Sequence, residues 1–401
     1  MKIRVGVFFG GNSTEHEISI ISALQATEYF DTDKYEIVPV YISKQNEFFV
    51  GDEVGDISNY KDINSLIKKS QRVIPVKNDN VADLLIYPPK TFGQKIYASI
   101  DVAFPVVHGT NVEDGTLAGM LKMLGIPFVG SDVTASAVGM DKYVMKCVLK
   151  DNDIPVLDCI TAGKQEYIKD KETVKSKIKS KINYPVIIKP VNLGSSIGIK
   201  IAKDDASLSD ALEHAFMFAP HILAERAVTN LKEVNISVLG DEETQETSEC
   251  EEPTLSDDIL RFEDKYMSDS GSRKTGASSK TGTMASLSRK LPAEITPEQK
   301  SAIQNLAVKT FKALDCNGVV RIDFMIDQDE DKIYVNEINT IPGSLSFYLW
   351  KAVDLNYKDL LDKMIQLALK RKRRQEDLTF SFTSNVLRYV NLSGCKGSKV
   401  Q

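Results

Sequence analysis

The chain has 401 residues, enough for two or three domains, and 42% of them are hydrophobic, enough to build buried cores. Its formal net charge of −6 excludes the general positive field that nucleic-acid-binding proteins present. No stretch approaches the length of an apolar membrane span, and the N-terminus enters a strand and a turn instead of a signal peptide. We therefore expect a globular, cytoplasmic protein that binds neither nucleic acid nor membrane.

Cysteine usage argues against a zinc site or a disulfide framework. The five cysteines are odd in number, show no CxxC spacing and have no accompanying histidine cluster. One run, Lys370 to Arg374, is locally basic, but it ends a helical pattern at 360–370, where cations complement the negative end of the helix dipole. We interpret this run as a solvated helix C-terminus rather than as a polyanion site.

The N-terminal segment has the pattern of a βαβ unit. An apolar run at 4–9 precedes Gly10 and Gly11, a segment with helical spacing at 16–30 and a second apolar run at 36–43. This order predicts an α/β domain with an open parallel sheet, whose functional residues lie at the carboxyl ends of the strands. A dinucleotide site is the alternative, but FGGNST does not match GxGxxG and no suitably placed acidic residue follows it.

A second strand, loop and helix are predicted over residues 101–130. The strand DVAFPVV leads into the loop HGTNVEDG and then into a helix that ends near Gly125. Glu113 and Asp114 fall in the first turn of that helix, where acids favour the helix dipole, so a capping role competes with a role in substrate binding. His108, directly after the strand, is either a loop histidine satisfied by its neighbours or a site residue.

Helices and strands alternate over residues 131–225, beginning with one helix expected over 135–150. Within this region YPVIIKPVNLGSSIGIKIA places a Gly-Ser-Ser turn between two β-branched runs, which predicts a hairpin. The turn offers backbone N–H groups, two hydroxyl groups and a nearby cation to a phosphate. The residues concerned are Lys189, Gly194, Ser195, Ser196 and Gly198. The pattern is not a P-loop, and a plain loop is the alternative.

The stretch at 320–346 places three oxygen-bearing side chains among apolar residues. IDFMID and KIYVNEIN have the alternation of two strands joined by a polar DQDED turn, which predicts a second hairpin. Glu337 and Asn339 are two residues apart and share a face, and Asp323 can meet them from the partner strand. Oxygen ligands favour Mg²⁺, or Mn²⁺ in its place, completed by substrate phosphates. The alternative is a solvated hairpin with ordinary surface acids.

Five motifs, taken in order, resemble those of the D-alanine:D-alanine ligase family of ATP-grasp enzymes. Besides the Gly-Ser-Ser turn and the second hairpin, they are GVFFGGNSTEHEIS at 6–19, VVHGTNVEDGTLAGMLKMLGIPFVGSDVTASAVGMDK at 106–142 and FEDKY at 262–266. Together they cover most of residues 1–370, so chance agreement is implausible. The segment at 267–290 is rich in Ser, Gly, Lys and Thr, which favours a flexible linker, and the resemblance makes it a longer form of the family's loop over ATP.

The resemblance implies an α/β fold with a three-subdomain ATP-grasp architecture. We expect an N-terminal substrate domain with an open parallel sheet at 1–130, a central ATP-grasp subdomain at 131–225 and a C-terminal ATP-grasp subdomain at 226–370. The last subdomain would carry the lid loop and the metal hairpin. Residues 371–401 form a basic tail that has no functional assignment.

The resemblance also implies an ATP-dependent, ADP-forming ligation for peptidoglycan precursor synthesis. One D-alanine carboxylate attacks the γ-phosphate of ATP, and the amine of a second D-alanine then displaces phosphate from the acyl phosphate. We expect Mg²⁺ as the cofactor and a homodimer. Two alternatives are a ligase with another acceptor, such as D-serine or D-lactate, and a nucleotide-binding regulator without turnover.

Motif matching assigns most of the nucleotide site. The expected phosphate-side residues are Lys142, Lys189, Lys265, Ser195 and Ser196. The acids expected near the adenine and the ribose hydroxyls are Glu225 and Glu233, with surface acids as the alternative. The expected metal ligands are Asp323, Glu337 and Asn339.

The substrate residues follow from the same motifs. Arg321 would stabilise the tetrahedral oxyanion, and its alternative is a salt bridge to Glu337. Glu15 would hold the ammonium group of the first D-alanine and belong to a hydrogen-bonded trio with Ser195 and Tyr266. The residues expected beside that pocket are His108 and Glu113.

The acceptor end departs from the family pattern. Family members usually have several more residues between the Pro-Gly pair and the downstream helix than IPGSLSFYLW provides. The Ser-Leu pair that grips the carboxylate of the second D-alanine lies in that shortened loop. Gly343 aligns with the family, and Ser344 and Ser346 are candidates for the carboxylate donor.

Overall fold

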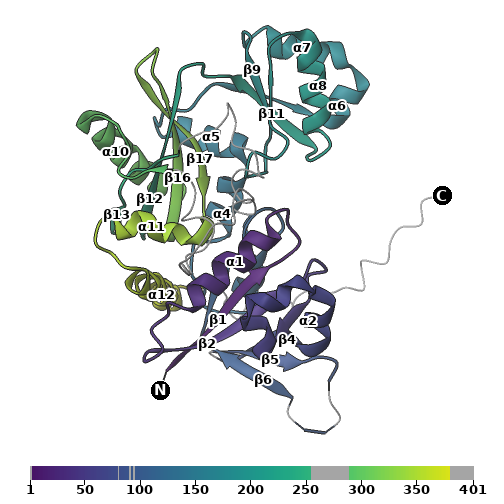
Figure 1. Cartoon of the computed structure of the whole chain (residues 1–401), viewed down its shortest axis with the longest axis vertical. Helices are drawn as coiled ribbons and strands as arrows, with labels where there is room; N and C mark the ends of the chain where they lie inside the picture. Colours follow the sequence, from purple (N-terminus) through teal and green to yellow (C-terminus); the bar gives the residue numbers. More distant parts are fainter. Residues whose placement is uncertain (1, 80, 90–91, 94, 254–288, 380–401) are drawn as a thin grey trace, which may run out of the picture.

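The structure, a computed structural model, describes residues 2–79, 81–89, 92–93, 95–253 and 289–379. Figure 1 shows an elongated molecule, with the N-terminal sheet at one end, the sheet around β9 and β11 at the other, and the sheet around β12, β16 and β17 beside them. The expected loop residues Lys265 and Tyr266 and most of the 267–290 segment lie outside the described residues. None of the described helices is long and apolar enough to cross a membrane.

The N-terminal domain is built on a seven-stranded sheet in the order β6-β5-β4-β3-β2-β1-β7. Its strands are β1 (Ile3–Gly10), β2 (Tyr35–Ile42), β3 (Phe48–Val50), β4 (Gln71–Asn78), β5 (Val81–Ile86), β6 (Ile96–Ile100) and β7 (Val102–Val106). The helices are α1 (His16–Thr27), α2 (Ile63–Lys69) and α3 (Thr116–Met123). The expected parallel sheet is parallel at β2, β1 and β7, while β3 to β6 extend it as antiparallel strands.

Two short helices, α4 (Val133–Met140) and α5 (Lys142–Asp151), replace the single helix predicted over 135–150. The chain breaks at Asp141, whose extended backbone cannot continue α4 and whose carboxylate accepts the N–H groups of Tyr143 and Val144 at the start of α5. The break turns Lys142 into the first residue of a new helix. Apolar residues of both helices belong to the buried cluster that also covers the β12–β16–β17 sheet.

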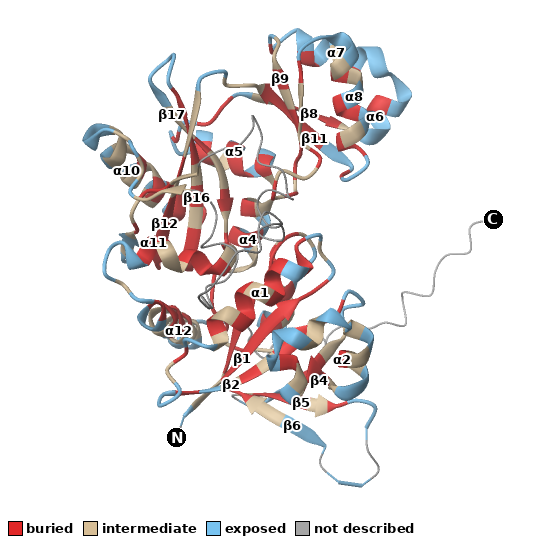
Figure 2. Cartoon of the chain, in the orientation of Figure 1, coloured by how far each residue is buried: buried red, intermediate tan, exposed pale blue. Residues whose placement is uncertain are grey.

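The central sheet has the order β10-β9-β11-β8. Its strands are β8 (Cys159–Gly163), β9 (Val186–Pro190), β10 (Lys200–Ala202) and β11 (His221–Arg226), and its helices are α6 (Lys164–Lys169), α7 (Lys171–Lys179) and α8 (Asp205–Ala215). The three helices bury one face of the sheet, and Figure 2 shows their outer sides exposed. Because β9 and β10 pair in antiparallel fashion, the predicted Gly-Ser-Ser hairpin is confirmed.

The C-terminal sheet has the order β13-β12-β16-β17. Its strands are β12 (Leu231–Gly240), β13 (Gln245–Thr247), β16 (Gly318–Asp327) and β17 (Lys332–Asn339), and α10 (Pro297–Ala313) packs on one face. The short strands β14 (Glu252–Pro253) and β15 (Arg289–Lys290) pair with each other. The last helices are α11 (Phe347–Lys351) and α12 (Tyr357–Glu376).

Helix α12 fastens the C-terminal sheet to the N-terminal domain. Its residues Leu361, Met364 and Ile365 belong to the same buried cluster as Val5 and Val7 of β1. The helix passes through residue 370, where the sequence analysis placed a domain boundary.

The basic run near the end of α12 is partly exposed, and it also pairs with acids that the sequence analysis did not anticipate. The ammonium group of Lys370 lies 2.5 Å from the carboxylate of Asp241, and the guanidinium of Arg374 lies 2.7 Å from that of Glu242. Arg371 donates hydrogen bonds to two backbone carbonyl groups in the 128–130 turn. The run therefore binds an acidic turn after β12 and the end of the N-terminal domain.

Candidate active site

Three predicted motifs meet at the carboxylate of Glu15. Ser195, in the Gly-Ser-Ser turn, donates a hydrogen bond to this carboxylate. The backbones of Gly194 and Gly109 both lie beside this carboxylate, since a Cβ atom added at Gly194 would lie 3.4 Å from it, in ordinary contact, and one added at Gly109 would lie 3.1 Å from it, which is tight. Glu15 is itself buried. The first βα turn, the loop after β7 and the turn between β9 and β10 thus form one site.

The Gly-Ser-Ser turn has an unusual backbone. Ser195 and Ser196 have φ values of 53° and 59°, in the left-handed region that L-residues rarely adopt. A side chain at Gly198 would meet Pro190 at 2.7 Å. Such strain persists only where the surroundings hold it, and it is common where a backbone must present its N–H groups to a ligand.

A buried carboxylate holds two lysines beside this turn. Glu225 contacts Lys146 at 2.5 Å and also contacts Lys189, and all three are buried. Burial alone raises the pKa of Glu225, but the two ammonium groups outweigh it and hold that pKa at about 2. Lys189 also donates to the Asn336 side chain at 3.3 Å. Glu225 is therefore not the surface acid that the sequence analysis kept as an alternative.

The predicted β16–β17 hairpin is confirmed, and its register places the three oxygen-bearing residues together. Asp323 lies opposite Glu337, and Arg321 lies opposite Asn339. The amide of Asn339 donates to Asp323 at 3.2 Å. Lys142, at the start of α5, lies 3.1 Å from the Glu337 carboxylate.

The salt bridge of Arg321 is to Asp323, within β16, and not to Glu337, which the sequence analysis kept as the alternative. The guanidinium of Arg321 contacts both carboxylate oxygens of Asp323, at 2.6 and 2.8 Å. Residues two apart on a strand share a face, so this pair forms without bending the chain. Although burial alone lowers the pKa of Arg321, the charge of Asp323 raises it well above its usual value.

The donor set at the hairpin fits a hard divalent cation. Among the residues that the structure describes, no group of three or more His, Cys, Asp and Glu side chains could hold a metal ion. Asp323, Glu337 and Asn339 offer two carboxylates and one amide instead. Mg²⁺ suits such an oxygen-only set, because it keeps waters and takes its remaining ligands from phosphates.

His108 and Glu113 contact the chain beyond β17. Glu113 accepts the N–H groups of Gly109 and Ile341, each at 2.9 Å, and His108 Nδ1 lies 2.9 Å from the Ile341 carbonyl oxygen. Because α3 begins only at Thr116, Glu113 precedes the helix and does not cap it. Burial, with the charge of Glu15, raises the pKa of Glu113 to about 7, and burial lowers that of His108 to about 4.

The turn at Gly343–Ser346 is the most strained backbone near the site. Ser344, Leu345 and Ser346 have φ values of 48°, 52° and 51°, three consecutive left-handed residues without a glycine. All three are buried. The hydroxyl group of Ser346 has no hydrogen-bond partner among the described residues.

The remaining predicted residues are Glu233, Ser196, Lys265 and Tyr266. Glu233 lies on β12 opposite Met325. Ser196 follows Ser195 in the turn. Lys265 and Tyr266 lie outside the described residues, so the structure describes only the Glu15 and Ser195 members of the expected trio.

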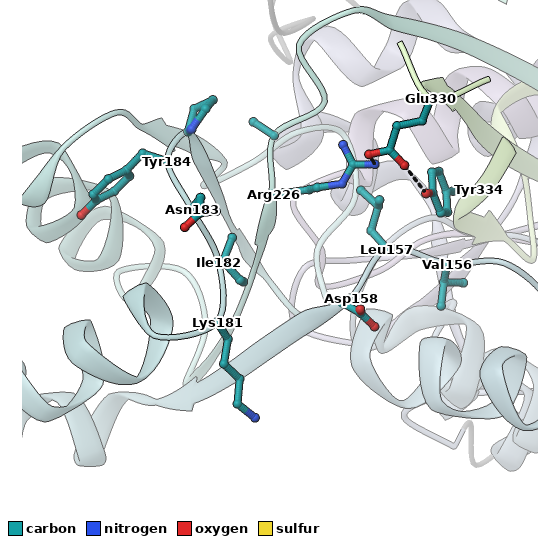
Figure 3. A pocket seen from close by; sticks show the side chains of 12 residues that line it. Val156, Leu157, Asp158, Lys181, Ile182, Asn183, Tyr184, Arg226, Glu330 and Tyr334 are labelled. Atoms are coloured by element: carbon teal, nitrogen blue, oxygen red, sulfur yellow. Dashed lines mark hydrogen bonds and ion pairs between the residues drawn. The ribbon is translucent and has the colours of Figure 1, made fainter. Parts of the chain in front are cut away.

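A separate cavity opens where the central and C-terminal subdomains meet (Figure 3). It has a volume of about 410 Å³, and its lining includes Leu157, Tyr184, Arg226, Glu330 and Tyr334. Arg226 points across the junction from the end of β11. Because Arg226 follows Glu225 on β11, its side chain projects from the opposite face of the strand.

Comparison with known families assigns the chain. The model described as "D-ala D-ala ligase N-terminus" matches residues 4–131, and the model described as "D-ala D-ala ligase C-terminus" matches residues 148–366. The chain belongs to the D-alanine–D-alanine ligase family. A D-alanine–D-alanine ligase from Thermosipho melanesiensis is 38% identical over 390 residues, which cover 96% of this chain and 98% of the relative.

Solved structures of D-alanine–D-alanine ligase family proteins support the fold. The D-alanine–D-alanine ligase of Coxiella burnetii is 28% identical, with a TM-score of 0.76, and covers 94% of this chain and 96% of its own. VanG D-Ala:D-Ser ligase of Enterococcus faecalis is 30% identical, with a TM-score of 0.75, and covers 92% of this chain and 100% of its own. The predicted α/β ATP-grasp architecture is confirmed.

Sequence reasoning missed three residues of this D-alanine–D-alanine ligase family site. Lys146 lies four residues after Lys142, and this spacing on one helix face could have pointed to it. Ser22, one of the buried hydroxyl residues of α1, contacts His108 at 3.1 Å. No sequence signal identifies Ile341, because only its backbone atoms take part.

Proposed function

We propose that this site joins two D-alanines through an acyl phosphate, in two steps carried out by the residues gathered around Glu15. Family membership makes the chain an ATP-dependent ligase that forms D-alanyl-D-alanine for peptidoglycan synthesis. The observation that carries the residue-level proposal is the contact between Glu15 and Ser195. It joins the first βα turn of the N-terminal domain to the strained turn of the central subdomain.

In the first step the donor D-alanine would lie with its ammonium group at Glu15. Its carboxylate would then face the γ-phosphate, which the N–H groups of Ser195 and Ser196 and the hydroxyl group of Ser196 would hold, while the Ser195 hydroxyl stays on Glu15. Lys142 would move from Glu337 to the phosphates, and Lys189 would move from Glu225. Both ammonium groups would then neutralise phosphate charge. Lys265 would add a further cation, Glu225 would lie near the adenine and Glu233 near the ribose.

Asp323, Glu337 and Asn339 would hold one or two Mg²⁺ ions. When bound, the metal supplies positive charge that offsets the phosphate oxygens. Before substrates bind, both carboxylates are neutralised by cations, since Lys142 contacts Glu337 and Arg321 contacts Asp323.

In the second step the acceptor amine attacks the acyl phosphate, and negative charge develops on the former carbonyl oxygen. Arg321 would stabilise this oxyanion, because its bidentate contact with Asp323 fixes the plane of its guanidinium. Tyr266 would complete the trio with Glu15 and Ser195. Gly343, Ser344 and Ser346 would receive the acceptor carboxylate, and this part of the proposal is supported by the hydroxyl of Ser346, which is buried and has no hydrogen-bond partner within the described part of the chain.

Phosphate release tests the reaction most directly. With ATP and Mg²⁺, we expect release that requires D-alanine and is not elicited by L-alanine, together with one dipeptide per phosphate. Equal rates with both enantiomers would exclude the assignment. Nucleotide binding without any turnover would favour a regulatory protein.

The shortened acceptor turn supports a second candidate, a ligase that uses D-serine. VanG, a D-Ala:D-Ser ligase, is 30% identical to this chain over nearly the full length of both. Competition between D-alanine, D-serine and D-lactate at equal concentrations, with products identified by mass spectrometry, separates the two candidates. We expect D-alanyl-D-alanine to dominate.

Three general features complete the proposal. Because the reaction consumes ATP, we place the enzyme in the cytoplasm. We propose a homodimer, which light scattering after size-exclusion chromatography tests. We also propose functional units at 1–130, 131–225, 226–370 and 371–401, and deletion of residues 380–401 should leave turnover unchanged.

A further inference from the structure

Ser22 connects the N-terminal domain to the strained turn after β17. Its side chain is 1% exposed and lies on the side of α1 that faces the site. The backbone N–H of Ser344 donates a hydrogen bond to Ser22 Oγ at 3.0 Å. His108 Nε2 lies 3.1 Å from the same oxygen.

The direction of these hydrogen bonds follows from the single hydroxyl proton. Because Ser22 Oγ accepts the Ser344 N–H, its own proton is free to be donated to His108 Nε2. His108 then carries its proton on Nδ1 and donates it to the carbonyl oxygen of Ile341, 2.9 Å away. Burial lowers the pKa of His108 to about 4, so the ring is neutral at physiological pH. With its proton on Nδ1, the ring donates to the Ile341 carbonyl and accepts from the Ser22 hydroxyl.

This chain of hydrogen bonds holds the turn at two points. Two residues of the loop after β7 bind the backbone of Ile341. Glu113 accepts its N–H at 2.9 Å, and His108 donates to its carbonyl oxygen. Ser22 binds the turn again three residues later, at Ser344. Three successive left-handed residues are unfavourable for L-amino acids, so the turn persists only where its surroundings fix it.

We propose that Ser22 is a positioning residue for the acceptor: its hydroxyl group fixes the Ser344–Ser346 turn and thereby sets selectivity for the second amino acid. The inference rests on the proposed role of this turn in binding the acceptor carboxylate. Ser22 itself touches neither substrate in this scheme. It acts through Ser344 and through His108, which also becomes a positioning residue.

Helix α1 supplies a matched control. Ser19 lies one turn before Ser22, is equally buried, and also makes two hydrogen bonds through its hydroxyl group. Its partners are Gly10 N–H and the Val106 carbonyl, in β1 and β7, and not the acceptor turn. Ser19→Ala therefore removes the same chemical group from the same helix without releasing the turn.

The first experiment compares Ser22→Ala, Ser22→Cys and Ser19→Ala by steady-state kinetics. Losing a buried hydrogen bond that positions the carboxylate donor should raise the acceptor KM about tenfold for both Ser22 variants. The KM values for ATP and the donor should stay within about twofold. The proportion of D-alanyl-D-serine formed from mixed D-alanine and D-serine should also change. Ser19→Ala should lower the melting temperature and leave the product ratio unchanged.

The second experiment does not depend on turnover. Hydrogen exchange in a peptide that covers 341–349 should become faster in Ser22→Ala and Ser22→Cys, but not in Ser19→Ala. Ser22→Cys keeps the side-chain volume, so it provides the result if the alanine variant does not fold. Unchanged exchange, or equal effects of Ser19→Ala on exchange and product ratio, would overturn the role of Ser22. Faster exchange in a protein that releases no phosphate with D-alanine would instead reject the proposed function alone.

Discussion

The two halves of the site are held together by different forces. On the proposed nucleotide side the charged groups pair with each other, as in Lys142 with Glu337 and Arg321 with Asp323. On the proposed acceptor side neutral hydrogen bonds hold a strained backbone, as at Ser344. When phosphates bind, each cation can leave its carboxylate partner and pair with a phosphate oxygen instead. A strained turn offers no such exchange, so it must be fixed before the substrate binds.

This difference predicts where single substitutions affect turnover and where they affect selectivity. Removing a charge on the nucleotide side should slow the reaction or destabilise the fold, because a partner charge is left behind. Removing a neutral hydrogen bond on the acceptor side should alter the shape of the turn, with a smaller effect on the overall rate. The following predictions test the two halves in order of expected effect.

The largest effect is expected from Glu337→Gln. The substitution removes one negative charge from the proposed metal ligands and leaves Lys142 without its ion pair. We expect kcat to fall by roughly 10²–10³-fold, the range found when a group that stabilises developing charge is removed. Asp331→Asn, an equivalent change in the exposed turn of the same hairpin, is the control. A Glu337→Gln variant with the wild-type kcat would refute the metal assignment.

The second prediction concerns the two lysines at Glu225. Lys146→Met leaves this buried carboxylate with Lys189 alone. Breaking a buried ion pair typically costs about 3–5 kcal/mol, and the remaining lysine should keep the loss near 3 kcal/mol. Urea unfolding measures it, with Lys150→Met, in a largely exposed pair with Asp158, as the control. Equal losses in the two variants would show that the Glu225 cluster behaves like a surface pair.

The sequence predicted the β16–β17 hairpin better than the turn that follows it. Strand alternation and the DQDED turn were enough to place Asp323 opposite Glu337, because register in a hairpin is a local property. The break at Asp141 was also local, but the apolar periodicity on either side of it concealed the break.

Other features could not be predicted because they depend on distant backbone atoms. The carbonyl group of Ile341 is bound by His108, more than 200 residues earlier in the chain, and no side-chain pattern records such a contact. The basic run ending at Arg374 had an apparent local explanation, yet its partners are acids after β12. Three left-handed residues without a glycine give no sequence signal either.

The third prediction tests the acceptor half through pH. Glu113 has a pKa of about 7 in the fold, against an ordinary value of 4.5, because burial and then the charge of Glu15 disfavour its ionised form. Between these values the folded state holds more protons than the unfolded state, so stability falls as pH rises. Relative to the wild type, the free energy of unfolding of Glu113→Gln should therefore rise by about 3 kcal/mol between pH 4.5 and a pH above 7.

Unfolding curves at several pH values measure this difference. His108, with its pKa lowered to about 4, contributes the opposite slope between about pH 4 and 6.5, but it is present in both proteins and cancels. A constant difference between wild type and Glu113→Gln across the range would mean that Glu113 is ionised throughout.

The smallest effect is expected at the junction in Figure 3, where Arg226 contacts Asp327 at 2.7 Å and Glu330 at 3.4 Å. Arg226 is about one-third exposed, so solvent screens the pair, and Arg226→Met should cost about 1 kcal/mol at neutral pH. Burial alone raises the pKa of Asp327, but hydrogen bonds from Arg226 and the turn outweigh it and lower that pKa below 3.8.

A lowered acid pKa stabilises the fold above about pH 4 and loses its effect as the pH falls through the folded value. The difference in melting temperature between wild type and Arg226→Met should therefore shrink toward pH 3. Lys332→Met, which removes an exposed cation from the same Glu330 carboxylate, is the control and should change little at any pH. If Arg226→Met instead lowers kcat as strongly as Glu337→Gln, this junction belongs to the proposed nucleotide half. The division of the site into exchangeable ion pairs and a fixed turn would then be wrong.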